Sequence, residues 1–173
     1  MGRQKLLLQV DGRSLLARAL DAAAVFPSVV VVSPELADRV PAAPGRTVVV
    51  NAEPQRGMTH SLALADAAVA DPEAALVVLL ADTPFVDRAL VRRVAAALGD
   101  ADVAYPVRDG VPGHPVAFAA AVRPRIQRLA DGDTLRRLRD DPALQAVAVA
   151  VTSDGPFVDV DTPADYHRLA QSG

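Results

Sequence analysis

A carboxylate follows an apolar run near the middle of the chain. Asp82 stands just beyond the run 75–80, in the segment Ala81-Asp82-Thr83-Pro84. Ligands of open α/β sheets bind beyond the carboxyl ends of the strands. A carboxylate there suits Mg²⁺ bound to nucleotide phosphates, because this hard cation takes one or two carboxylates and keeps several waters. The position equally suits a turn or a helix cap, so both interpretations stay open.

A second acidic cluster lies close to the end of the sequence. Asp159 and Asp161 alternate, so an extended backbone directs both side chains to one side. Asp161 is therefore a candidate for a second metal ligand facing Asp82. The alternative is that Asp161 or Thr162 caps the last helix, for which Pro163 is a favourable first residue.

Polar residues also mark the start of a predicted helix at residues 58–70. Thr59, His60 and Ser61 stand at its amino end, behind the loop 51–57. The exposed amides of a helix amino terminus suit the polar groups of a nucleotide. An ordinary connection with several caps explains the pattern as well. His60 has no partner in the pattern, which argues against a catalytic histidine.

A histidine loop and a lysine complete the candidates. In Gly113-His114-Pro115, glycine permits close backbone approach and proline stiffens the loop. His114 is either a hydrogen-bonding group for an acceptor phosphate or a structural histidine. Lys5 follows Gly2 and either meets a phosphate as a point charge or is a solvated charge.

Composition and missing motifs exclude several functional classes. The 173 residues fit one domain, and 51% are hydrophobic, with 3% aromatic. There is no cysteine, which excludes disulfides, thiolate metal sites and a cysteine nucleophile. No P-loop, dinucleotide fingerprint or Gly-x-Ser-x-Gly elbow occurs. A net charge of -3 argues against a nucleic-acid partner.

The sequence also argues against a membrane protein. The apolar runs are too short for a signal peptide or a membrane span. Together with the lack of cysteine, this fits a cytoplasmic protein without membrane contact.

Strand and helix patterns alternate along the chain. The strand runs are nearly continuous rather than alternating, which predicts strands covered on both faces. We therefore predict a single α/β domain over 1–173, with a doubly wound, Rossmann-like, mostly parallel sheet and helices on both faces. The predicted strands are 29–32, 47–50, 75–80, 102–107, 116–119 and 146–151, and the predicted helices are 14–25, 58–70, 88–98, 120–130, 133–139 and 163–170.

These segments resemble the MobA/MocA-type nucleotidyltransferases, and among them most closely the molybdenum cofactor cytidylyltransferases. Family members open with a strand and the loop Leu-Ala-Ala-Gly-x-Ser-x-Arg-Met-Gly-x-x-Lys-Leu-Leu, whose last part matches residues 1–7. Further motifs follow in family order over nearly the whole chain. They are Gly57-Met58-x-x-Ser61-Leu62, Asp82-x-Pro84, Gly113-His114-Pro115 and Asp159-x-Asp161-Thr162-Pro163-x-Asp165-Tyr166.

The resemblance implies transfer of CMP from CTP to the molybdopterin cofactor, with release of pyrophosphate. It implies that Asp82 and Asp161 hold Mg²⁺ and that Lys5 contacts the triphosphate, so these residues are the expected catalytic set. A molybdoenzyme or a maturation factor is the implied protein partner. The expected nucleotide-binding residues are Gly2, Lys5, Asn51, Gly57, Met58 and Ser61, and the expected acceptor-binding residues are Gly113, His114 and Pro115.

The resemblance further implies that the family's first strand and glycine-rich loop, whose amides hold the triphosphate, are lacking from 1–173. A start codon assigned too late would account for this. Two other functions stay open at this point. One is nucleotidyl transfer of another base, guanylyl included, to a different phosphorylated acceptor. The other is nucleotide binding by an inactive relic.

Overall fold

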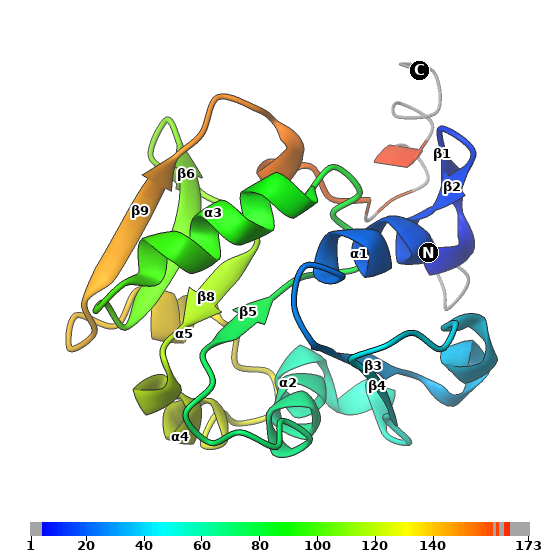
Figure 1. Cartoon of the computed structure of the whole chain (residues 1–173), viewed down its shortest axis with the longest axis horizontal. Helices are drawn as coiled ribbons and strands as arrows, with labels where there is room; N and C mark the ends of the chain where they lie inside the picture. Colours follow the sequence, from blue (N-terminus) through cyan, green and yellow to red (C-terminus); the bar gives the residue numbers. More distant parts are fainter. Residues whose placement is uncertain (1–4, 161, 163–164, 167–173) are drawn as a thin grey trace.

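The computed structural model describes residues 5–160, 162 and 165–166, and shows strands and helices of an α/β fold (Figure 1). Its larger sheet contains β5 (Leu76–Val78), β6 (Val103–Arg108), β7 (Val111–Pro112), β8 (Val116–Phe118) and β9 (Ala146–Ala150). β8 lies between β5 and β6, while β9 and β7 both pair with β6. β8 is antiparallel to both neighbours and β9 is parallel to β6, so β5, β6 and β9 point the same way.

The direction of β8 follows from the short connection before it. Residues 109–115 hold only the β6–β7 turn, β7 itself and the histidine loop. A parallel return would need a crossover of about a dozen residues or more. The predicted α/β fold with a mostly parallel sheet is confirmed. β8 runs antiparallel to β5 and β6 because the connection before it is short.

The two faces of the five-stranded sheet are covered by different helices. Ala104 of β6 and Ala117 of β8 pack against α3 (Arg88–Leu98), which crosses the strands in Figure 1. The alternate side chains Val103, Val116 and Phe118 face a second cluster on the other side. That cluster includes residues of α2 (Met58–Ala67), α4 (Arg123–Ile126) and α5 (Arg136–Arg139).

A smaller pair of strands forms the other region of the molecule. β3 (Ser28–Val32) and β4 (Arg46–Val50) are parallel and in register from end to end. Neither pairs with a strand of the larger sheet among the described residues. α1 (Leu15–Ala23) packs Leu16 and Leu20 towards β3, and its Ser14 side chain caps it by accepting a hydrogen bond from Ala17 N at 3.1 Å.

The helix α2 joins the two regions. It contacts β3 on one side, and its Leu62 belongs to the core cluster of the larger sheet. Its Asp66 is 6% exposed and pairs with Arg123 of α4. Gln127 adds a hydrogen bond to the same carboxylate at 2.6 Å. This polar contact is buried, so it fixes α2 against α4.

Most predicted elements agree with the observed bounds, and two helices do not. Residues 120–130 form only η4 (Ala120–Val122) and α4, and the predicted helix 133–139 is reduced to α5. Gly132, with φ of 88°, breaks the chain between them. The helix predicted at 163–170 lies largely outside the described residues. The other short elements are η1 (Lys5–Leu7), β1 (Gln9–Val10), β2 (Arg13–Ser14), η2 (Pro34–Arg39), η3 (Pro54–Arg56) and η5 (Gly155–Phe157).

The expectation that every strand is covered on both faces is wrong for residues 47–50. Val48 is 38% exposed and Val50 is 47% exposed. β4 carries the same valine-rich pattern as the buried strands, but one of its faces has no covering layer in the part of the chain described. Within that same part, no helix is long and apolar enough to cross a membrane.

Candidate active site

Lys5 and Asp82 meet across 77 positions of sequence. The Lys5 Nζ lies 2.9 Å from the Asp82 Oδ2, and the two side chains are 18% and 26% exposed. The other carboxylate oxygen of Asp82, Oδ1, is buried and has no hydrogen-bond partner among the described residues. A buried oxygen left in this state is costly, typically by about 1–3 kcal/mol. Asp82 therefore retains an acceptor position for a cation or a donor.

The turn after β5 and the segment before the chain end hold Asp82 in place. The Thr83 hydroxyl donates to the Leu80 carbonyl at 2.8 Å, which tightens the turn. Val160 N donates to the Asp82 carbonyl at 3.1 Å. This bond brings Asp159, an exposed residue, beside the same pocket. Asp161 lies outside the described residues, so its predicted place opposite Asp82 stays a prediction.

The histidine loop is held by backbone contacts. Gly113 N donates to the Pro106 carbonyl at 2.9 Å, and His114 N donates to the Pro156 carbonyl at 3.0 Å. A Cβ atom on Gly113 would lie 2.5 Å from the Pro156 oxygen and 2.8 Å from the Phe157 ring. Glycine is therefore required here by close packing. Pro115 is fully buried behind the loop and joins it through a cis peptide bond.

The His114 side chain is neutral near pH 7. Burial lowers its pKa below the ordinary value of 6.5, and the charges of Arg139 and Arg136 lower it further. The charge of Asp82 and a hydrogen bond to the Val78 backbone oppose this shift in pKa. The His114 Nδ1 is buried and has no hydrogen-bond partner among the described residues. A neutral imidazole in this position can accept or donate one hydrogen bond to a ligand.

These groups share one cavity of about 440 Å³. Asp82 and His114 line it together with the aromatic ring of Phe157 and the arginines of α5. A pocket of this size with few convergent polar groups is typical of small-molecule sites. The full lining is Met58, Leu80, Asp82, Thr83, Val111, Pro112, Gly113, His114, Val116, Thr134, Leu135, Arg136, Arg139, Pro156, Phe157 and Asp159.

The predicted nucleotide segment reaches this cavity only through Met58. Asn51 is 2% exposed, and its side chain donates to Ser61 Oγ at 3.0 Å and accepts from Glu53 N at 2.8 Å. Asn51 and Ser61 therefore organise the loop that carries Gly57, whose φ of 91° is in the region that favours glycine. Gly57 is exposed and opens α2.

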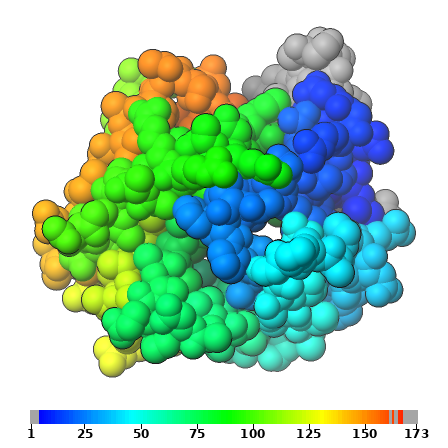
Figure 2. Space-filling view, in the orientation of Figure 1, coloured from blue at the N-terminus to red at the C-terminus, as the bar shows by residue number. Residues whose placement is uncertain are grey.

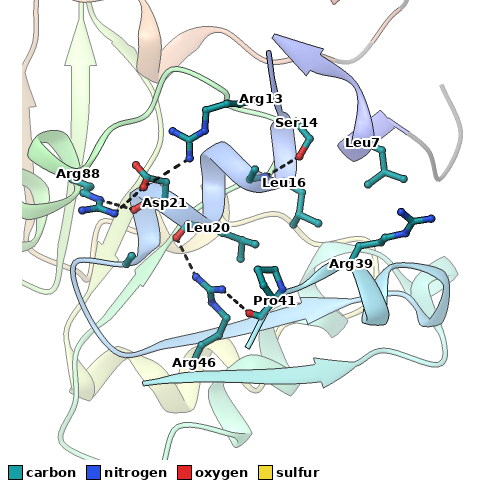
Figure 3. A pocket seen from close by; sticks show the side chains of 12 residues that line it. Leu7, Arg13, Ser14, Leu16, Leu20, Asp21, Arg39, Pro41, Arg46 and Arg88 are labelled. Carbon is teal, nitrogen blue, oxygen red and sulfur yellow. Dashed lines mark hydrogen bonds and ion pairs between the residues drawn. The ribbon is translucent and has the colours of Figure 1, made fainter. Parts of the chain in front are cut away.

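A larger cavity of about 560 Å³ lies elsewhere and contains none of the predicted site residues. Figure 3 shows it between α1 and the start of β4. Three of its four lining arginines are engaged within the chain: Asp21 pairs with Arg88 at 2.7 Å and lies 3.8 Å from Arg13, and Arg46 donates to the Pro41 carbonyl at 2.8 Å. The candidate site is therefore the smaller cavity, which Asp82 and His114 line and whose Asp82 pairs with Lys5.

Of the predicted site residues, the structure brings Asp82, Met58, Gly113 and His114 to one cavity, and Lys5 pairs with Asp82. Gly2 lies outside the described residues. Sequence reasoning missed Arg136 and Arg139, which line the same cavity from α5. Their spacing of three residues places both on one face of a helix, and this was the available signal.

A lysine-paired carboxylate beyond the end of a strand, beside a histidine loop in an α/β fold, is the arrangement expected of a nucleotidyltransferase. The chain belongs to the family of the MobA-like NTP transferase domain, whose sequence profile matches residues 1–149. Comparison with curated protein sequences gives no match.

Several solved structures of other proteins have the same fold. Rv0371c from Mycobacterium tuberculosis H37Rv is 27% identical, with a TM-score of 0.83 over 96% of this chain and 88% of that chain. The same protein in complex with manganese gives 26% identity and a TM-score of 0.84, over 98% and 92%. A molybdopterin-guanine dinucleotide biosynthesis protein A from Archaeoglobus fulgidus is 19% identical, with a TM-score of 0.72 over 97% and 89%, and shares the fold.

Proposed function

We propose that this protein transfers CMP from CTP to a molybdopterin-type acceptor, with Mg²⁺ as the metal and pyrophosphate as the second product. The observation that carries the proposal is the pairing of Lys5 with Asp82 beside a cavity, which leaves one carboxylate oxygen of Asp82 without a partner among the described residues. Family membership supports nucleotidyl transfer in general. The choice of CTP and of molybdopterin is the finer part of the proposal.

The residues present fit a divalent cation. A buried carboxylate oxygen without a partner is the ligand type that Mg²⁺ prefers, and Asp161 would supply a second carboxylate. A bound cation of this kind neutralises charge on the triphosphate and orients its phosphates. Rv0371c has been crystallised with manganese, which supports a divalent metal in the same fold.

The reaction joins a phosphate oxygen of the acceptor to the α-phosphorus of the nucleotide. The bond between the α-phosphorus and the bridging oxygen breaks, and pyrophosphate leaves with that oxygen. Lys5 stabilises the negative charge of the phosphates as a point charge, and its ion pair with Asp82 holds it in place. His114 orients the acceptor by a hydrogen bond. No covalent intermediate on the protein is needed, so catalysis depends on positioning and charge.

Two motifs support the cytidylyl reaction over its alternatives. Gly113 to Pro115 and Gly57 to Leu62 resemble the corresponding segments of cytidylyl members of the family. Guanylyl transfer is the second candidate, supported by the name of the Archaeoglobus protein with the same fold. An inactive nucleotide-binding relic is the third.

Pyrophosphate release tests the proposal. The protein is assayed with the magnesium salts of CTP, GTP, ATP and UTP, with molybdopterin cofactor as the acceptor. A form that carries the family's glycine-rich loop ahead of residue 1 is assayed in parallel, because the resemblance places that loop on the triphosphate. We expect turnover with CTP above the other nucleotides. Turnover with GTP alone would favour the guanylyl reaction, and nucleotide binding without turnover would favour the relic.

The role of Asp82 is tested by Asp82→Asn, with Asp100→Asn as the matched control. Asp100 is an exposed carboxylate at the end of α3, away from the cavity. We expect Asp82→Asn to lower kcat by about 100-fold or more while the protein stays folded by circular dichroism. The control keeps wild-type turnover. Near wild-type rates for Asp82→Asn at saturating Mg²⁺ would remove Asp82 from the mechanism.

A further inference from the structure

We propose that Arg136 is the anion-binding residue of the 440 Å³ cavity and that it selects acceptors carrying a phosphate monoester. The identification of the ligand as an acceptor rests on the proposed function, because it names the charged group of that acceptor. The proposal also predicts phosphate binding that needs no turnover.

Arg136 differs from its neighbours by having no acidic partner. Arg137 pairs with Asp133 at 3.0 Å, and Arg139 pairs with Asp140 at 2.7 Å. The Arg136 side chain forms no hydrogen bond or ion pair with any residue that the structure describes, although its charge contributes to lowering the pKa of Asp140. It is exposed and lines the cavity. Its guanidinium is therefore available to a ligand in that cavity.

The backbone around Arg136 is fixed by burial on both sides of it. Leu135 and Leu138 are each 4% exposed and pack in the core cluster beneath α5. Asp133 accepts a hydrogen bond from Ala130 N at 2.9 Å, which closes the turn before α5. An arginine on such an anchored turn keeps its position at small conformational cost, which favours binding.

The charges in the cavity explain why an arginine is needed there. Asp82 and Asp159 line the same cavity and repel an anion, and Lys5 offsets only the first of them. His114 is neutral near pH 7, so it supplies a hydrogen bond and no charge. Arg136 and Arg139 are the cations of the described lining. Arg139 is engaged with Asp140 and lies over the Tyr105 ring.

The geometry of a guanidinium suits a phosphate monoester. Its planar set of donors binds two phosphate oxygens at once, whereas a lysine offers a single point charge. A phosphate held by Arg136 lies in the same cavity as His114 and Asp82. An acceptor without a phosphate would lose this contact.

Binding of inorganic phosphate tests the proposal directly. The imidazole signals of His114 are followed by NMR during a phosphate titration, and His114→Gln identifies them among the three histidines. We expect Arg136→Gln to weaken phosphate binding by about tenfold or more, because a charge-assisted hydrogen bond is lost. Arg136→Lys should retain part of the affinity. Arg137→Gln, on the same helix and 69% exposed, should bind within about twofold of wild type.

Three results would overturn the proposal. They are no phosphate binding by the wild-type protein, wild-type phosphate affinity in Arg136→Gln, or an equal loss of affinity in Arg136→Gln and Arg137→Gln. These outcomes do not depend on turnover. Loss of phosphate binding in Arg136→Gln, in a protein that transfers no nucleotide, would support the anion site and reject the proposed reaction. In an active protein, Arg136→Gln should raise KM for the acceptor and leave KM for the nucleotide unchanged.

Discussion

Two regions of this molecule are built from similar valine-rich strands and differ in how well they are covered. In the five-stranded sheet, Val103, Val116 and Phe118 are at most 2% exposed. In the two-stranded pair, Val48 and Val50 of β4 are 38% and 47% exposed. Figure 2 shows an opening between the blue N-terminal residues and the cyan residues around β4. A run of β-branched residues thus specifies a strand, while its burial depends on the layers around it.

The candidate cavity belongs to the better-covered region. Asp82 follows β5, and His114 precedes β8, which pairs with β5. Arg136 stands on a turn anchored in the core of the same sheet. Groups that must keep a fixed geometry are best placed on well-packed elements. Lys5 is the exception, because it reaches Asp82 from the N-terminal segment next to the less-covered pair.

The largest expected effect is a difference in the free energy of unfolding between a substitution in the five-stranded sheet and one in the two-stranded pair. Phe118→Ala empties a fully buried site in β8 and should lower the free energy of unfolding by about 3–5 kcal/mol. Val48→Ala on exposed β4 should change it by less than about 1 kcal/mol. Both are measured by urea denaturation followed by circular dichroism. Equal losses would show that β4 is covered in solution.

A second effect concerns the helix that joins the regions. Asp66→Ala leaves the Arg123 guanidinium, 11% exposed, without its charge partner. Breaking a buried pair on one side typically costs about 3–5 kcal/mol, and the remaining bonds from Arg123 to the Asp71 and Ala74 carbonyls should keep the loss near the lower end.

Hydrogen exchange gives this prediction a local readout. The amides of α2 and β3 should exchange faster in Asp66→Ala than those of β6 and β9, because α2 is released from α4. Uniform acceleration over the whole chain would mean that α2 is not the link between the two regions. Asp141→Ala, which removes a more exposed partner of Arg125, serves as the control.

Much of the fold could be predicted from periodicity. The runs at 29–32, 47–50 and 146–151 are strands within a residue or two, and the caps Asp87 and Gly99 bound α3 as expected. The exposure of β4 could not be predicted, because a continuous apolar run is the same whether or not a layer covers it. The helix 120–130 failed because local propensity does not record how the chain breaks around Gly132.

The sequence predicted which residues belong to the candidate site better than it predicted the contacts between them. Asp82 was found from its position after a strand, and His114 from its loop. The ion pair between Lys5 and Asp82 spans 77 positions, so no local pattern could reveal it. Arg136 was missed because most arginines near it pair with acids on the surface, and only the structure distinguishes the one that does not.

A smaller effect is expected at the glycine of the histidine loop. Gly113→Ala places a methyl group 2.5 Å from the Pro156 oxygen, so the loop or the 155–157 turn must move. Overpacking of this kind costs about 1–3 kcal/mol. The shift should raise KM for the acceptor and leave β3 and β4 unchanged in hydrogen exchange. A variant with wild-type stability and wild-type KM would show that this loop adapts freely and does not position His114.

The smallest expected effect is electrostatic and lies at the turn that carries Arg136. The hydrogen bond from Ala130 N, and after it the Arg137 side chain, lower the pKa of Asp133 below its ordinary value of 3.8. A carboxylate with a lowered pKa stabilises the folded state above the ordinary value, and this contribution is lost as the pH falls through the folded pKa. Asp133→Asn should therefore lower the urea midpoint slightly at pH 6. The difference from wild type should shrink as the pH falls below about 3.8 and vanish only where the folded wild-type carboxylate is protonated as well. A difference that persists unchanged at that pH would assign the effect to the shape of the Asp133 side chain. The position of Arg136 would then depend on the packing of this turn and not on the charge of Asp133.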